Sequence, residues 1–199
     1  MKRKLLLLLS SVVITFVSCK KQDAKTDTTA TQGIQGTYKL KYITVKDNST
    51  LSALNQKSVN VVNYTTTNNG GTFVIDASNI TTSGLTWEAT DSVPTYTYYN
   101  NQLVDSTKSS FIIKYPATNS STSYKLIGTD SIYLPQGGPA SVILSGTGLP
   151  AGSYGGRYNL SGNVLTIIQS ASKDSTFQSN GLSYTLSATE IASVVMEKQ

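Results

Sequence analysis

The chain has 199 residues, of which 38% are hydrophobic and 14% charged, with one cysteine and no histidine. This length fits one domain with a tail, and the many Thr, Ser, Asn and Tyr residues favour strands and turns over helices. Without histidine or a second cysteine, Ser-His-Asp and Cys-His catalysis, ordinary zinc sites and an internal disulfide are excluded.

The net charge of +5 comes mainly from the first 25 residues, because from Gly36 onward ten Lys and Arg stand against nine Asp and Glu. A nearly neutral domain offers no electrostatic attraction for a polyanion. We therefore expect no nucleic-acid partner.

Residues 1–18 have the pattern of a signal peptide. The basic start MKRK precedes the apolar run LLLLLSSVVITFV at residues 5–17. That run has the length of a signal-peptide core and is too short to span a bilayer comfortably. A buried helix of the domain is the alternative, but the flanking charge and the terminal position favour export.

The apolar run leads directly into Cys19, within FVSCKK. This junction resembles the lipobox of bacterial lipoproteins, although Phe16 stands where that family usually has Leu, Val or Ile. The resemblance implies that the Cys19 thiol carries diacylglycerol and palmitate-type acyl chains, which anchor the protein in the cell envelope at the outer membrane. Either face of that membrane is possible. A free thiol and an intermolecular disulfide are the alternatives.

Residues 19–35 follow as a tether. The sequence KKQDAKTDTTATQGIQ has no apolar periodicity and few large hydrophobic residues. Such a composition is typical of a flexible linker. The domain itself is expected at residues 36–199.

From residue 36 the hydrophobic pattern has period two. In GTYKLKYITV, Tyr38, Leu40 and Tyr42 alternate with two lysines, which is typical of a strand with one face in a core. Similar runs recur at 58–65, 71–77, 84–90, 95–100, 109–116, 123–129, 131–135, 140–146, 156–160, 164–168, 181–187 and 191–198. This spacing predicts an all-β fold, an antiparallel meander closing into a barrel, with a β-sandwich as the alternative.

Several connections are expected from local residues. NNGG at 68–71 and SGN at 161–163 predict hairpin turns, and a further turn is expected at Asn100-Asn101. Leu51 and Leu54 are spaced for one turn of a short helix within 49–58. The segment 135–156 is rich in Gly and Pro, so we expect a long loop or an irregular edge strand there, and a first place to seek ligand contacts.

Candidates for catalysis are few. Glu88 and Asp91 are near neighbours, but on one strand they would lie on opposite faces and be solvated. Four Asp-Ser pairs could suggest calcium-binding turns, yet their irregular spacing favours ordinary turn chemistry. We therefore expect no enzymatic activity, no metal and no cofactor.

Tyrosine is the unusual residue, with twelve copies against four Phe and one Trp. Tyr96, Tyr98 and Tyr99 lie close together and, with Trp87, could form an aromatic platform for a sugar or an apolar ligand. The alternative is that these rings line strand faces and are structural.

Three segments resemble the lipocalin-like domains of Bacteroidetes lipoproteins: GTYKL at Gly36–Leu40, GRYNLSGNVLTI at Gly156–Ile167 and YTLSATEIASVVMEK at Tyr184–Lys198. The resemblance implies a small antiparallel barrel that holds one small apolar or amphipathic ligand. It identifies no ligand-binding residue, since the matched positions are structural. A glycan-binding or adhesion β-sandwich, and a structural accessory subunit of an envelope complex, are the alternative functions.

Overall fold

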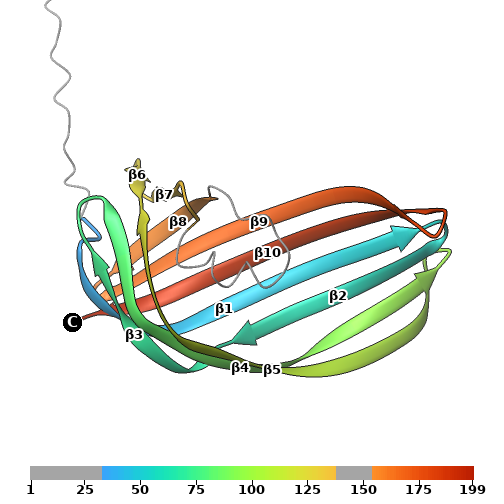
Figure 1. The fold of residues 1–199 in the computed structure, drawn as a ribbon, viewed down its shortest axis with the longest axis horizontal. Coiled ribbons are helices and arrows are strands. Elements are labelled where there is room, and N and C mark those ends of the chain that lie inside the picture. Colours follow the sequence, from blue (N-terminus) through green and yellow to red (C-terminus); the bar gives the residue numbers. More distant parts are fainter. Residues whose placement is uncertain (1–32, 138–153) are drawn as a thin grey trace, which may run out of the picture. The chain divides into compact units, whose positions relative to one another are not determined.

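The computed structural model describes residues 33–137 and 154–199 (Figure 1). These residues belong to one compact unit, Thr31–Gln199. The signal peptide, Cys19, nearly all of the tether and the strand predicted at 140–146 lie outside the described residues. Within the two described ranges, no helix is long and apolar enough to cross a membrane.

The prediction of an all-β antiparallel fold is confirmed. The strands are β1 (Gly36–Ala53), β2 (Gln56–Thr65), β3 (Thr67–Ile75), β4 (Asn79–Tyr99), β5 (Gln102–Ser123), β6 (Lys125–Ile127), β7 (Ser131–Leu134), β8 (Tyr154–Ser161), β9 (Val164–Ser179) and β10 (Leu182–Lys198). They form one sheet, in which β4 pairs with β5 at one edge and the order continues through β3, β1, β10, β9, β8 and β7 to β6. β2 pairs with both β1 and β4.

The two edges of this sheet are joined by a single residue. β5 ends at Ser123 and β6 begins at Lys125, so only Tyr124 separates the edge strands. In a flat sheet with a strand spacing of about 4.8 Å, these edges would stand roughly 40 Å apart. The sheet must therefore curl, and this end has a partly ring-like arrangement. Tyr124 holds the closure by donating from its N–H to the Ser78 carbonyl at 2.8 Å and from its hydroxyl to the Asp76 carbonyl at 2.7 Å.

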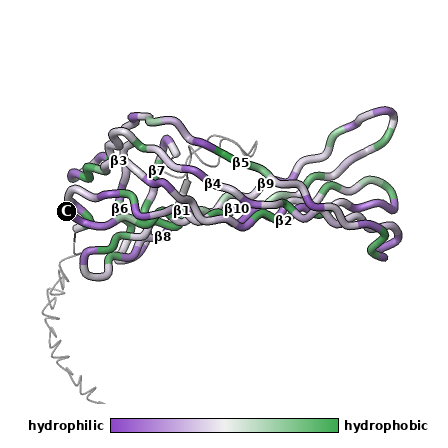
Figure 2. The backbone as a smooth tube through the Cα atoms, turned by 90° about the horizontal axis from the view of Figure 1, so that it is seen from below, coloured by the Kyte–Doolittle hydropathy of each residue, from purple (hydrophilic) through white to green (hydrophobic). Residues whose placement is uncertain are grey.

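The inside of this ringed end is filled with the chain's own side chains. The buried apolar residues that pack together there are Ile34, Tyr38, Leu40, Ile43, Val45, Phe73, Ile75, Ile80, Leu85, Trp87, Ala89, Tyr124, Ile132, Leu134, Tyr158, Leu165, Ile167, Ala192, Val194 and Met196. Along most strands they alternate with outward-facing residues, as the period-two pattern predicts, and Figure 2 shows this alternation of hydrophobic and hydrophilic residues along the chain. The core is thus close-packed from within.

Three hairpins continue past the core. We call residues 47–62, 91–111 and 171–190 the extension. Its strands lie in the order β5, β4, β2, β1, β10 and β9, and its three turns meet at one end, on the right in Figure 1. β3, β6, β7 and β8 do not reach this part. Among the described residues no second layer covers it, so beyond its root, where Glu190 is buried, both faces of the sheet are open.

Two predicted turns are confirmed. Asn100 and Asn101 both have positive φ, at 48° and 62°, as a two-residue type I′ hairpin turn requires between Tyr99 and Gln102. At the SGN turn, Ser161 pairs with Val164 across a Gly162 with a φ of 57°.

The prediction of a hairpin at NNGG, residues 68–71, is wrong. These residues lie inside β3, where the pairing with β4 is bulged on both sides of Gly70. Positive φ at Asn68 and Gly71 is used by the bulges instead of a turn. The Asn69 amide donates to the carbonyls of Lys41 and Thr66, at 2.8 and 3.1 Å, and so ties the bulged strand to β1.

Other local expectations are also corrected. No helix forms at 49–58, because β1 runs to Ala53 and β2 begins at Gln56, so cross-strand pairing replaces the single helical turn. The runs at 84–90 and 95–100 are one strand, β4. Pro94 is tolerated there because residues 89–94 of β4 have a pairing neighbour on the β5 side only. Of the four Asp-Ser pairs, only Asp130-Ser131 lies at a turn.

Candidate functional site

The inner face of the extension continues the face that forms the core. Side chains alternate along β1, so Asp47, Ser49 and Leu51 point to the same side as the buried Val45. The same alternation carries this face across the neighbouring strands. On this face, the residues that pair across the strands form rows, and the chemistry of the rows changes from the core towards the turns. The first row is acidic, the second is polar, and the rows at the turns are apolar and aromatic.

The rows nearest the turns are apolar. Leu51 pairs with Leu186, and Phe177 pairs with Tyr184, with their rings stacked at a centroid distance of 5.4 Å. Tyr99, 49% exposed, closes this end on β4. Large apolar side chains that stand together in water are typical of an interaction surface.

A pocket of about 270 Å³ lies within these rows. Its floor includes Ala53 and Gln56, which pair with each other across β1 and β2. Tyr99 stands on one side, and Tyr184 and Leu182 on the other. Leu54 and Asn55, at the β1–β2 turn, complete the lining.

A polar row separates the apolar rows from the core. Thr95 on β4 donates its hydroxyl to the Asn60 carbonyl oxygen at 2.7 Å, and the Asn60 amide donates to Ser49 at 3.5 Å. This chain of hydrogen bonds crosses three strands, β4, β2 and β1. Its hydroxyl and amide groups can both donate and accept, which suits an uncharged polar group of a ligand.

The acidic row stands at the root of the extension. Asp47 on β1 is directly opposite Glu190 on β10, and the Glu190 side chain is fully buried. Like charges placed opposite each other are unfavourable. Burial raises the pKa of Asp47 above its ordinary value. Lys173 lies on the same face one row further out, opposite Ala188.

The pKa of Tyr64 responds to the negative charges of this acidic row. Its ring meets Phe111 edge-on at 5.7 Å, and burial, followed by the negative charges of Glu190 and Asp47, raises the pKa of its phenol from 10.0 to about 12. Each of these effects disfavours the phenolate. The root of the inner face is therefore a place where added negative charge is costly.

The Tyr64 shift predicts a loss of stability in alkali. The folded protein keeps this proton between pH 10 and about 12, where the unfolded chain releases it, so the contribution is complete below pH 10 and is lost as the pH rises towards 12. We expect this group to remove about 1–2 kcal/mol of unfolding free energy, less than the ~2.7 kcal/mol of a fully shielded group because solvent screens it.

Urea unfolding followed through Trp87 fluorescence, repeated from pH 9 to 12, measures this loss. Tyr64→Phe should flatten the fall in unfolding free energy, while Tyr133→Phe, on the outer face, should leave it unchanged. Tyr38 and Tyr124, whose pKa burial also raises, add to the slope that remains. Equal slopes for wild type and Tyr64→Phe would show that the Tyr64 shift is wrong.

The predicted aromatic platform is not assembled as one surface. Trp87 is 3% exposed and stacks on Tyr115 in the core, with ring centroids 5.2 Å apart. Tyr96 and Tyr98 lie on the outer face, where Lys57 Nζ stands 4.7 Å from the centre of the Tyr98 ring. Only Tyr99 of the four lines the inner-face pocket. Sequence alternation already separates Tyr99 from Tyr96 and Tyr98, and that signal could have been used.

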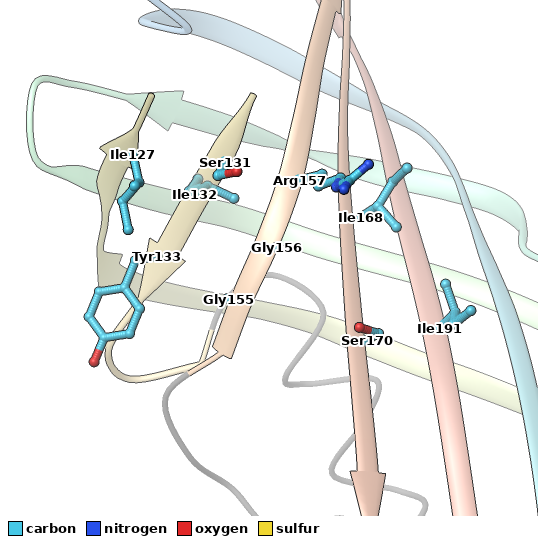
Figure 3. A pocket seen from close by; sticks show the side chains of 10 residues that line it. All are labelled: Ile127, Ser131, Ile132, Tyr133, Gly155, Gly156, Arg157, Ile168, Ser170 and Ile191. Carbon is cyan, nitrogen blue, oxygen red and sulfur yellow. The ribbon is translucent and has the colours of Figure 1, made fainter. Parts of the chain in front are cut away.

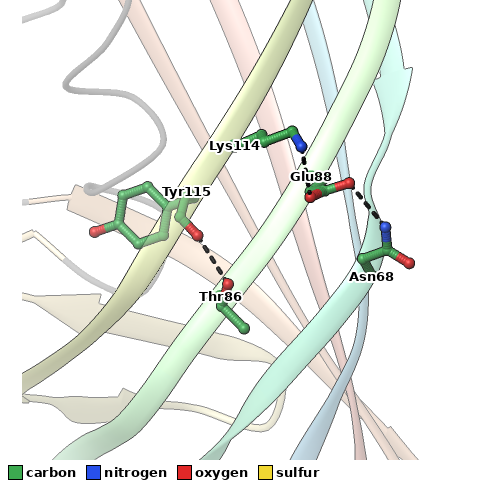
Figure 4. Close-up of polar contacts among 5 residues, drawn as sticks. All are labelled: Asn68, Thr86, Glu88, Lys114 and Tyr115. Atoms are coloured by element: carbon green, nitrogen blue, oxygen red, sulfur yellow. Dashed lines mark hydrogen bonds and ion pairs between the residues drawn. The ribbon is translucent and has the colours of Figure 1, made fainter.

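Glu88 acts as a brace between strands (Figure 4). Its carboxylate accepts from Asn68 Nδ2 at 2.8 Å on β3 and forms an ion pair with Lys114 Nζ at 3.6 Å on β5. Beside it, the Thr86 hydroxyl donates to the Tyr115 carbonyl at 2.8 Å. Asp91 instead accepts from the N–H of Ser92 at 2.7 Å. The two acids therefore serve different local contacts.

Searches against protein-family models, curated proteins and solved structures found no match. Within residues 33–137 and 154–199, no three His, Cys, Asp or Glu side chains gather as metal ligands would. The resemblances to the lipobox and to lipocalin-like domains stay predictions from the sequence. The functional argument rests on the geometry of the inner face.

Proposed function

We propose that this protein is a non-catalytic lipoprotein of the cell envelope that binds a small apolar or amphipathic molecule on the inner face of the extension. The observation that carries the proposal is the contrast between the two parts of that face. At the ringed end the inward positions are filled by core side chains. In the extension the face is uncovered, and its apolar rows surround a pocket.

The rows define the chemistry of the ligand. Its apolar part would lie over Leu51, Leu186 and the Phe177–Tyr184 stack, where it removes apolar surface from water. Its polar part would meet the hydrogen-bonded row of Thr95 and Asn60. Because hydroxyl and amide groups form this row, an uncharged polar group suits it.

The membrane anchor is the second part of the proposal, and it rests on the sequence of residues 1–35. Cys19 would carry the acyl chains and residues 20–35 would tether the domain. Cys19→Ser should abolish incorporation of radioactive palmitate in cells that process lipoproteins. Labelling that persists in the Cys19→Ser protein would contradict the anchor without touching the binding proposal.

A glycan is the second candidate ligand. It is favoured by the side-chain amides of Asn55 and Gln56 beside the Tyr99 ring in the same pocket. Aromatic rings next to amides suit a sugar, whose C–H face packs on the ring while its hydroxyls bond to the amides.

Native mass spectrometry of the protein purified from its membranes tests the binding proposal. We expect a bound mass that denaturation releases and that partitions into organic solvent. A bound mass that partitions into water and is cleaved by glycosidases would support the glycan instead. Protein that carries no added mass and does not enhance the fluorescence of the neutral apolar dye N-phenyl-1-naphthylamine would contradict both.

A further inference from the structure

A second surface, on the opposite face of the sheet, also has the features of a ligand site (Figure 3). It is a groove of about 480 Å³ on the outer face of β6 to β10, which we call the outer groove. Its lining consists of Ile127, Ser131, Ile132, Tyr133, Gly155, Gly156, Arg157, Ile168, Ser170 and Ile191. None of these residues belongs to the inner-face site.

A glycine creates the hollow. Gly155 on β8 pairs with Tyr133 on β7, and a Cβ at Gly155 would meet no atom within 4 Å. Every other residue type would fill this space. The neighbouring Gly156 is needed for a different reason. A Cβ at this position would lie 2.6 Å from the Ile168 carbonyl oxygen. Gly156 is thus required for packing, while Gly155 leaves open space that packing does not require.

The walls of the outer groove are apolar and open to water. Ile127 is 59% exposed, and Ile168 and Ile191 are about 40% exposed. Tyr133 stands beside the glycine hollow (Figure 3). Isoleucines normally point into the core of a sheet, so this gathering of exposed ones on one face indicates a binding surface.

The charge beside these walls is positive. Arg157 stands in one row with Ser131 and Ile168, its pairing partners. Lys125 pairs with Tyr133, and Lys46 pairs with Ile191, so lysines flank the next row at both ends.

These cations are not neutralised by the described part of the chain. Within residues 33–137 and 154–199, no ion pair joins Arg157, Lys125 or Lys46 to an acid. Two acids directly precede lining residues in the chain: Glu190 is buried on the inner face, opposite Asp47, and Asp130 accepts the Ser131 hydroxyl at 2.9 Å.

We propose that the outer groove binds a single-chain anionic amphiphile. Its alkyl chain would lie along Tyr133, Ile168 and Ile191, over the Gly155 hollow. Its carboxylate or phosphate would be held by the Arg157 guanidinium, whose planar fork matches both groups. This ligand differs in charge from that of the inner face, and the inference does not depend on the proposed function.

Isothermal titration of the full chain with dodecanoate, dodecyl phosphate and uncharged dodecanol, all below micelle formation, tests the outer groove. Arg157→Gln should weaken binding of both anions by at least tenfold and leave dodecanol unchanged. Gly155→Leu, which fills the hollow, should weaken binding of both anions by at least tenfold. Comparison of the two anions in wild type shows which head group is preferred.

Three control variants keep the test decisive. Arg157→Lys keeps the charge but loses the planar fork, so its affinity for the anions should lie between those of wild type and Arg157→Gln. Lys108→Gln, a cation on β5, should have no effect. Leu51→Lys, on the inner face, should leave the binding of both anions unchanged, which separates this proposal from the proposed function. If Gly155→Leu lowers the melting temperature, Gly155→Val replaces it. Anion binding that survives Arg157→Gln, or that Lys108→Gln weakens equally, would overturn the proposal.

Discussion

Replacing Trp87 by alanine should lower the free energy of unfolding by about 3–5 kcal/mol, the range for large aromatic residues in a core. Trp87 is 3% exposed and stacks nearly parallel to Tyr115, at an interplanar angle of 6°. The substitution removes both the buried area and the ring contact. Because small domains are stable by only about 5–15 kcal/mol, such a loss would leave the fold marginal.

Trp87→Phe is the matched control. In the described part of the chain, the buried indole Nε1 has no hydrogen-bond partner. Phenylalanine keeps a ring against Tyr115 and removes that unsatisfied donor, so we expect a cost below about 1.5 kcal/mol. Urea unfolding followed by far-ultraviolet circular dichroism measures both variants. If Trp87→Ala lowers the free energy of unfolding by less than about 1 kcal/mol, Trp87 has no core role, and the predicted aromatic platform would be favoured instead.

Replacing Gly71 by alanine should cost about 2–5 kcal/mol, the sum of backbone strain and overpacking. Gly71 has a φ of 108°, and its Cβ would stand 2.7 Å from the Leu85 Cα and 2.9 Å from the Gly84 carbonyl oxygen. These are backbone atoms of the paired strand, so they cannot turn aside as a side chain would. The bulges that join β3 to β4 would have to open.

Gly84→Ala provides the comparison. Gly84 also has positive φ, at 62°, but its Cβ would meet nothing within 4 Å. Only the conformational cost remains, about 1–2 kcal/mol. The melting temperatures of the two variants should therefore differ clearly, with Gly71→Ala the lower. Equal melting temperatures would mean that β3 and β4 do not approach each other as closely as described.

Local sequence predicted the fold class because alternation and turn residues act over a few positions. The period-two run at Tyr38 and Leu40 and the turn at Asn100-Asn101 are both present as expected. NNGG failed for a physical reason: Asn and Gly supply positive φ equally to a turn and to a bulge, and only the partner strand decides between them. The length of β5 was missed because both its faces are largely exposed, which removes the alternation.

The candidate site could not be predicted in the same way. Leu51 meets Leu186, and Asp47 meets Glu190, across more than a hundred residues of chain. Such contacts depend on the register between strands, which no short pattern records. Trp87 was grouped with Tyr96 and Tyr98 because they are close in sequence, although β4 pairs regularly from Trp87 to Tyr96 and simple alternation puts the two on opposite faces. Tyr99 was predicted to bind a ligand and does line the inner-face pocket, but the residues grouped with it, Trp87, Tyr96 and Tyr98, lie elsewhere.

The central claim is that a ligand lies on the inner face of the extension, and two adjacent residues of β1 test it most directly. Leu51 points to that face, where it pairs with Leu186, and Thr50 points to the other side. We expect Leu51→Lys to weaken binding of N-phenyl-1-naphthylamine at least tenfold, and Thr50→Lys to change it less than twofold, in fluorescence titrations at equal far-ultraviolet circular dichroism. Equal affinities for the two variants would contradict the inner-face site.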